Sequence, residues 1–243
     1  MVNIVKAEHQ KAKRTMRRKL VWGFPVLTFG MAFVFTLGME NAYAESVWNW
    51  WYTLLLPGMI GIFCYLSVVQ EKKTKYYHLM TLSINKSRFM MGKIIYIGCM
   101  IFLSNVIVFV GATIGGFVFT TQIPVGGAAM AVLLLTVTQL WEIPFSLFLS
   151  ERFGMIVNLF ICLFITVCGV VMSQTGKWYW LVSAIPMRIL CPFLHILPNG
   201  LKAGSGSPFL NTEVIVPGLG LSILCFFLTT AVFLKWFENR EVK

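Results

Sequence analysis

The chain has 243 residues, of which 58% are hydrophobic and only 12% are charged. Soluble domains carry about 25% charged residues, so this composition excludes a large soluble domain and predicts an all-α membrane protein with several spanning helices. The net charge of +11 does not indicate nucleic acid binding, because the positive residues flank the apolar runs, where membrane topology places them.

A basic head opens the chain. The segment Met1–Lys19 contains seven Lys/Arg and a single acid, Glu8. Apolar residues recur in it with a weak helical spacing. We therefore predict a helix that lies on the inner surface of the membrane, with its cations near anionic lipid headgroups.

Six apolar runs follow, each long enough to cross about 30 Å of hydrocarbon as a helix. The predicted spans lie near Leu20–Met39, Trp51–Val69, Ile94–Thr120, Ala128–Leu149, Gly154–Ser173 and Ile215–Phe237. After the first run, Ala42–Ala44 has the A-x-A form of a signal-peptidase site. The run of about 20 residues exceeds the 7–15 of a signal peptide, so we expect an uncleaved helix.

The basic residues are distributed unevenly along this pattern. All but three of the 20 Lys/Arg lie in the head, in 70–93, in the turn 150–153 or in the tail. The exceptions are Lys177, Arg188 and Lys202. Positive residues favour the cytoplasmic side, so we expect a multi-pass protein of the cell membrane with both termini in the cytoplasm.

Aromatic residues gather at the predicted outer boundaries. They are Trp48, Trp50–Tyr52 and Trp178–Trp180. Such clusters are typical of the aromatic belt at a membrane interface.

Residues 70–93, QEKKTKYYHLMTLSINKSRFMMGK, form the predicted cytoplasmic segment between the second and third spans. We predict a helix over Lys72–Leu82, a break at Ser83–Ser87, and Ser87 as the N-cap of the third span. The apolar positions that would form a docking surface are Tyr76, Tyr77, Met80, Leu82 and Ile84. The simpler alternative is a solvated loop. The apolar stripe and a length beyond the usual 2–8 residues favour a docking surface.

Residues 174–214 form the predicted outer segment between the fifth and sixth spans. Pro186, Pro192 and Pro198 recur in it and would interrupt a single spanning helix. We predict short re-entrant helices, which membranes tolerate where they are buried in protein or line a cavity. The candidate substrate residues are Trp178, Trp180, Arg188, His195 and Asn199.

Glu142 is the one ionisable side chain well inside a predicted span. A carboxylate there costs about 2–3 kcal/mol or more, so it should face protein or water. It is either a gating or substrate-pathway contact, or a packed carboxyl beside Gln139 or a partner subunit. The sequence leaves both interpretations open.

Sequence motifs for chemistry are missing. The chain contains no G-x-x-x-x-G-K-[ST], no H-E-x-x-H and no G-x-S-x-G. We therefore expect no catalytic residue, no metal site and no cofactor bound by this chain.

The layout resembles the membrane subunit of type-2 ABC transporters. The resemblance lies in the basic head, the six spans and the segment 70–93, with Glu71, Leu79–Leu82, Ser83–Arg88 and then Gly92-Lys93. The proline usual in this break is replaced by Ile84-Asn85. The resemblance implies an N-terminal interfacial helix, a cytoplasmic coupling helix between spans two and three, and re-entrant outer helices between spans five and six.

Three further segments are similar to the lantibiotic-immunity permeases: Ile4–Thr15, Ile143–Gly154 and the element from Pro186 to Pro198-Asn199-Gly200. This resemblance implies export of antimicrobial peptides and immunity to them. It also implies two cytoplasmic ABC ATPase subunits that bind ATP and Mg²⁺, and a second permease chain, identical or paralogous. The alternatives are another substrate (a drug, a bacitracin-like peptide or a lipid) or a non-transporting membrane scaffold or sensor.

Overall fold

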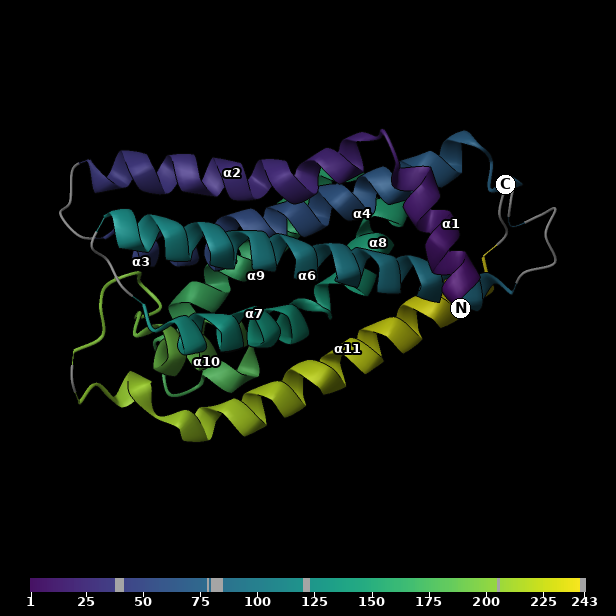
Figure 1. Ribbon diagram of the computed structural model, residues 1–243. Helices are drawn as coiled ribbons and strands as arrows, with labels where there is room; N and C mark the ends of the chain where they lie inside the picture. Colours follow the sequence, from purple (N-terminus) through teal and green to yellow (C-terminus); the bar gives the residue numbers. More distant parts are fainter. Residues whose placement is uncertain (38–41, 78, 80–84, 120–122, 205, 241–243) are drawn as a thin grey trace.

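The fold is a bundle of long helices, seen in a computed structural model (Figure 1). The structure describes residues 1–37, 42–77, 79, 85–119, 123–204 and 206–240. Within these residues there are helices, turns and one isolated β-bridge. The predictions at Met80, Leu82 and Ile84 fall outside the described residues.

The α-helices keep the labels of Figure 1. They are α1 (Val2–Ala12), α2 (Met16–Thr36), α3 (Tyr43–Trp50), α4 (Leu56–Lys73), α6 (Lys86–Val118), α7 (Val125–Gln139), α8 (Glu142–Arg152), α9 (Met155–Ser173), α10 (Ile185–Leu194) and α11 (Ile215–Glu238). A π-helical turn, Trp51–Leu55, joins α3 to α4.

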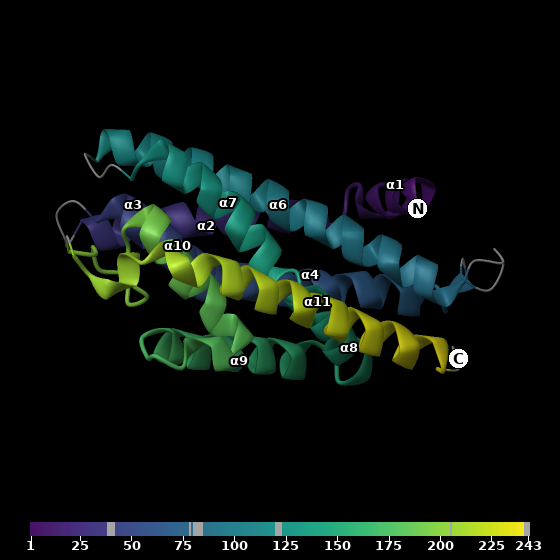
Figure 2. The ribbon, with the colours of Figure 1, turned by 90° about the horizontal axis from the view of Figure 1, so that it is seen from below.

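The membrane character predicted from composition is confirmed in its coarse form. In the described part of the chain, five helical stretches are long and apolar enough to cross a membrane, and the bent pair α7–α8 makes up to six. Large apolar side chains such as Phe160, Ile156 and Val216 lie exposed on them, as expected of surfaces that face lipid. Figure 2 shows α8 and α9 on the side of the bundle away from α1 and α6.

The fourth predicted span, Ala128–Leu149, is not one straight helix. α7 ends at Gln139, α8 begins at Glu142, and the two axes differ by 43°. Pro144 explains the break, because its ring clashes with the carbonyl of Leu140 and it has no N–H to donate there. The Ile143 N–H donates to the Leu140 carbonyl instead (3.2 Å).

The basic head is also divided. Met1–Lys19 was expected to lie in one interfacial helix, but α1 ends at Ala12 and α2 begins at Met16. Arg14 between them adopts a left-handed φ of 61°, which turns the chain so that α1 crosses the end of the bundle (Figure 1). The last residues of the head therefore belong to the first long helix.

The expected helix Lys72–Leu82 is interrupted. α4 ends at Lys73, and Lys75 and Tyr76 have left-handed φ values of 48° and 53°. The predicted N-cap also moves. Asn85 caps α6 by accepting a hydrogen bond from the Ser87 N–H (2.8 Å), and Ser87 lies within the helix.

Residues 174–214 form short elements, as the prolines predicted. α10 is the one α-helix among the residues of this segment that the structure describes, and Pro186 lies in its first turn. His195 ends this helix with a φ of 54°. An antiparallel bridge between Ile196 and Lys202 then closes a tight loop. Whether this segment dips into the membrane stays a prediction.

The aromatic cluster before α4 is core rather than a belt. Trp48, Trp51 and Tyr52 are all about 1% exposed or less. The indole Nε1 of Trp51 donates to Asn105 Oδ1 on α6 (2.8 Å). The buried aromatic rings and this polar contact fix α3 and the π-helical turn after it against α6. The interfacial prediction for these three residues is therefore wrong.

Candidate functional sites at the two ends of the bundle

The bundle has two distinct ends. The basic end carries α1, the chain after α4 and the last turn of α11, and the far end carries residues 174–214 (Figure 1). In the described residues, both the N-terminal helix and the end of α11 lie at the basic end. Lys86 Nζ confirms this by donating to the carbonyls of Glu238 (3.0 Å) and Arg240 (2.7 Å).

Five charged side chains form a buried ion cluster at the basic end. Its members are Glu8, Lys11, Arg17, Glu71 and Lys93. They come from α1, α2, α4 and α6, so the cluster joins four helices.

Lys93 is the centre of the ion cluster. Its Nζ lies 3.0 Å from Glu8 Oε2 and 3.2 Å from Glu71 Oε1. Lys11 Nζ contacts the same two carboxylates at 3.0 and 2.8 Å. Arg17 donates to Ser67 Oγ (3.1 Å) and to Gln70 Oε1. Glu8 therefore contacts three cations inside the protein, and Glu71 contacts two.

Burial and charge act in opposite directions on Glu8. Burial favours the neutral carboxyl, but the ammonium groups of Lys93 and Lys11 outweigh it and lower the pKa of Glu8 to about 2, from 4.5. For Lys11, burial acts to lower the pKa, and Glu8 and Glu71 more than offset it, so that pKa is raised. Both side chains are therefore charged at neutral pH.

A second group, the Glu151 cluster, consists of Tyr76, Glu151 and Arg240. The Tyr76 hydroxyl donates to Glu151 Oε2 (2.8 Å), and Arg240 pairs with Oε1. The Tyr76 ring also packs near Phe237. Burial and the Glu151 carboxylate raise the pKa of Tyr76. The cluster ties the chain after α4 to α8 and α11.

The two predicted docking tyrosines are therefore separated. Tyr76 is 5% exposed and serves the Glu151 cluster, so its side chain faces the protein. Tyr77 is 63% exposed at the same end. Of the described residues on the predicted stripe, Tyr77 is the exposed one and Tyr76 the buried one.

Glu142 and Gln139 are both buried. Glu142 stands at the start of α8, directly after the bend. Its Oε1 has no hydrogen-bond partner in the described part of the chain, so Gln139 does not satisfy that atom. Its burial agrees with a packed carboxyl, and a gating or substrate-pathway contact stays a prediction.

The five predicted outer residues do not converge on one pocket. Trp178 is buried, near α11, and Trp180 is exposed. The Arg188 guanidinium stacks over the Phe209 ring, 4.1 Å from its centroid. Asn199 Oδ1 accepts a hydrogen bond from the Leu201 N–H (3.1 Å). His195 alone lines a cavity described below.

An open cavity of about 580 Å³ lies at the far end. Its polar wall is made by Glu45 of α3, by His195 and by Lys202. Lys202 Nζ lies 3.3 Å from Glu45 Oε1. Glu45 is a cavity residue that the sequence patterns did not predict. The signal was a single carboxylate placed between Tyr43 and the buried aromatic residues.

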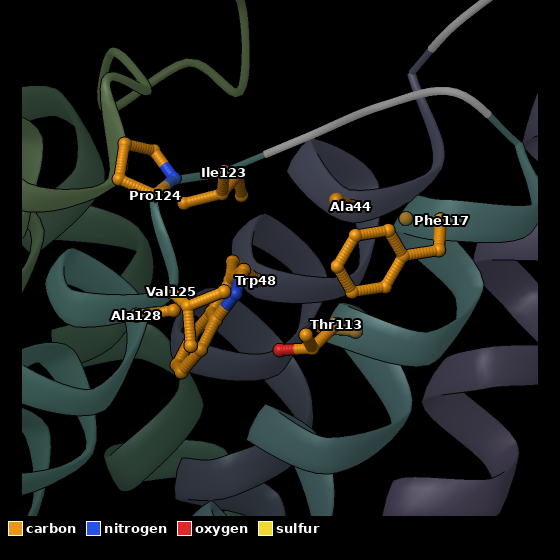
Figure 3. Close-up of a pocket in the computed structure, with 10 residues that line it drawn as sticks. Ala44, Trp48, Thr113, Phe117, Ile123, Pro124, Val125 and Ala128 are labelled. Carbon is orange, nitrogen blue, oxygen red and sulfur yellow. The ribbon is translucent and has the colours of Figure 1, made fainter.

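A smaller, mainly apolar cavity of about 280 Å³ adjoins it. Figure 3 shows Trp48 and Val125 on one side of this cavity and Phe117 and Thr113 on the other. Ile123 and Pro124 line both cavities. The far end therefore has a larger cavity that carries three polar side chains on an otherwise apolar lining, beside a smaller cavity lined almost wholly by apolar residues.

Comparison with protein families, with curated proteins and with solved structures gives no match. Function is therefore argued from the residues at the two ends. Among the described residues, no group of three or more His, Cys, Asp or Glu is placed to hold a metal ion.

Proposed function

We propose that this protein is the membrane subunit of an ATP-driven ABC transporter that expels antimicrobial peptides of the lantibiotic kind from the cell membrane. In this proposal the basic end faces the cytoplasm and two permease chains, identical or paralogous, pair with two ATPase subunits. The ATPases bind ATP and Mg²⁺. Immunity follows because the peptide is removed before it can permeabilise the membrane.

The observation that carries this proposal is the Glu151 cluster. A soluble partner that presses on the chain after α4 needs a rigid path into the spans. Tyr76 supplies one, because its hydroxyl is bonded to Glu151 of α8, and Arg240 after α11 is paired with the same carboxylate. Lys72 adds a hydrogen bond to the Glu151 carbonyl (2.8 Å). Force on this segment would reach α4, α8 and α11 together.

The ion cluster supports the same arrangement. It holds α1 across α2, α4 and α6, so the basic end would move as one body. The exposed cations of the head, among them Lys6, Lys13 and Arg18, remain available for anionic lipid headgroups. Exposed Tyr77 is then the described residue that we assign to contact with the ATPase.

The test is reconstitution of the full chain with candidate cytoplasmic ABC ATPase subunits. We expect a stable complex whose ATP turnover depends on the permease. Tyr77→Ala should lower the stimulated turnover several-fold, since aromatic anchors dominate such interfaces. Tyr179→Ala is the matched control, because Tyr179 is also an exposed tyrosine but lies at the far end.

If the Tyr77→Ala permease still assembles with the ATPase and stimulates ATP turnover as the parent chain does, this segment does not couple the two subunits. Failure of the chain to bind any such ATPase would favour a scaffold or sensor. Cells that make both subunits should survive higher doses of a lantibiotic than cells with the permease alone. Equal survival, with ATP turnover intact, would point to a different substrate on the same scaffold.

A further inference from the structure

Glu45 and Glu142 are the two described acids that are buried with a carboxylate oxygen lacking a partner, and Glu45 is the one of the two that lines the far-end cavity. It is 5% exposed, and its Oε2 has no hydrogen-bond partner in the described part of the chain. Its Oε1 is paired with a lysine that is itself 60% exposed. A buried carboxylate oxygen without a hydrogen-bond partner lowers the stability of the folded protein. Its presence in a cavity wall therefore points to a role in binding.

We propose that Glu45 is the recognition carboxylate for the primary ammonium of an amphipathic ligand that enters the far-end cavities. The ligand's ammonium replaces Lys202 at Glu45 in the larger cavity. Its apolar part occupies the adjoining chamber beside Trp48 and Phe117. The inference deepens the proposed function and rests on it, since the ammonium would then be a lysine side chain of the exported peptide.

The two partners of the ion pair differ in exposure, and this difference indicates that the ligand is positively charged. Lys202 is mostly in solvent, and an exposed lysine leaves a surface pair at little cost. Glu45 is 5% exposed in the cavity wall, so it depends on a paired cation more than Lys202 depends on a paired anion. A cationic ligand lets Lys202 return to solvent and keeps the carboxylate paired. An anionic ligand would draw Lys202 away and leave a buried charge without a partner, which is far less favourable.

The size and lining of the cavities agree with an amphipathic ligand. Sites for small ligands usually measure about 300–1,000 Å³ and combine apolar walls with a few polar groups. The larger cavity, of about 580 Å³, carries Glu45 and His195, and the smaller carries Trp48, Phe117 and Val125. Because Ile123 and Pro124 line both, one ligand can place its head and its body in adjacent chambers.

The test is equilibrium binding of labelled decylammonium to the full chain in phosphatidylcholine nanodiscs, corrected for discs without protein. Decanol and decanoate serve as neutral and anionic analogues. We expect saturable binding of decylammonium alone. Glu45→Gln, which keeps the shape and removes the charge, should weaken it about tenfold or more. Lys202→Gln should leave it equal or strengthen it up to about fivefold.

Lys177→Gln is the control, since Lys177 is also an exposed lysine of the far end, and it should change nothing. The inference is overturned if Glu45→Gln binds decylammonium as well as the parent chain, or if decanoate binds more tightly than decylammonium. Equal weakening by Glu45→Gln and Lys202→Gln would also overturn it, because the pair would then act as a structural bridge.

Two further experiments distinguish a peptide lysine from a lipid headgroup as the origin of the bound ammonium. A lysine-containing amphipathic peptide should displace decylammonium from the parent chain. Addition of phosphatidylethanolamine to the discs should not displace decylammonium. Displacement by this lipid would show that the site binds a lipid headgroup and would overturn the peptide assignment. No ATPase is present in these discs, so a failure here is distinct from a failure of the ATPase complex.

Discussion

The two ends of the bundle use buried carboxylates in opposite ways. At the basic end, Glu8 and Glu71 are each paired with lysines that are themselves largely buried, and the charges satisfy one another. At the far end, Glu45 is paired with one exposed lysine and keeps an oxygen without a partner. We interpret the enclosed pairs of Glu8 and Glu71 as structural, and the incomplete pair of Glu45, which lines a cavity, as a ligand site.

The difference has an energetic consequence. Removing one partner from a buried and mutually paired set leaves an uncompensated charge, which costs several kcal/mol. Neutralising a carboxylate that is poorly paired costs little and can even stabilise the fold. The same kind of substitution should therefore give large effects at one end and small effects at the other.

The largest effect is expected from Lys93→Met. Lys93 is 1% exposed and contacts both Glu8 and Glu71. Its loss should lower the free energy of unfolding by about 3–5 kcal/mol, measured by denaturant titration in a mild detergent. Lys177→Met, at an exposed site, should change it by less than about 0.5 kcal/mol. Equal effects of the two would mean that the ion cluster does not hold the basic end.

Acid should weaken the basic end next most strongly. The pKa of Glu8 is lowered to about 2 in the folded protein, from 4.5. Its contribution is therefore complete above the unfolded pKa and is lost as the pH falls from about 4.5 through about 2. The shift corresponds to about 3 kcal/mol.

The measurement is the free energy of unfolding as a function of pH, for the parent chain and for Glu8→Gln. The parent should lose stability between about pH 4.5 and about pH 2, and Glu8→Gln should be less stable at neutral pH but flatter over that range. Parallel curves for the two proteins would show that Glu8 does not titrate in the ion cluster.

Gly92→Ala tests the packing that places α1 over the ion cluster. A methyl group at Gly92 would overlap the Ile4 side chain of α1, so we expect a loss of about 1–3 kcal/mol. Gly23→Ala is the control, because no atom lies within 4 Å of the added methyl, and it should be neutral or slightly stabilising. Ile4→Ala combined with Gly92→Ala should recover most of the free energy of unfolding that Gly92→Ala loses. If it does not, overlap with Ile4 is not the cause of the destabilisation.

The sequence predicted the long helices because length and apolar composition are local properties. It did not predict the bend before α8, because the apolar run Ala128–Leu149 continues across Pro144 and its composition resembles that of an unbroken span. The interruption after Lys73 depends on Tyr76 turning inward to Glu151, a partner 75 residues away. No local pattern carries that information.

The candidate sites were predictable only in part. Exposed cations such as Lys6 remain in the head, but Lys11 and Arg17 turn inward to buried carboxylates of their own and of other helices. The lone acid of the head, Glu8, was the available signal. At the far end the aromatic residues drew attention to 178–200, and Glu45 was missed because its cavity is assembled from α3, α10 and the loop around Lys202.

The smallest effect is expected from Glu45→Gln, and it sharpens the contrast between the two ends most directly. The pair with Lys202 is solvated on one side and contributes about 1 kcal/mol or less, and the neutral amide avoids the cost of a half-satisfied buried charge. The free energy of unfolding should therefore stay within about 1 kcal/mol of the parent, in the same denaturant titration that shows the large loss for Lys93→Met. A loss of about 3 kcal/mol or more would place Glu45 with the structural charges of the basic end. If Glu45→Gln keeps the free energy of unfolding nearly constant and abolishes decylammonium binding, this carboxylate serves ligand binding rather than the stability of the fold.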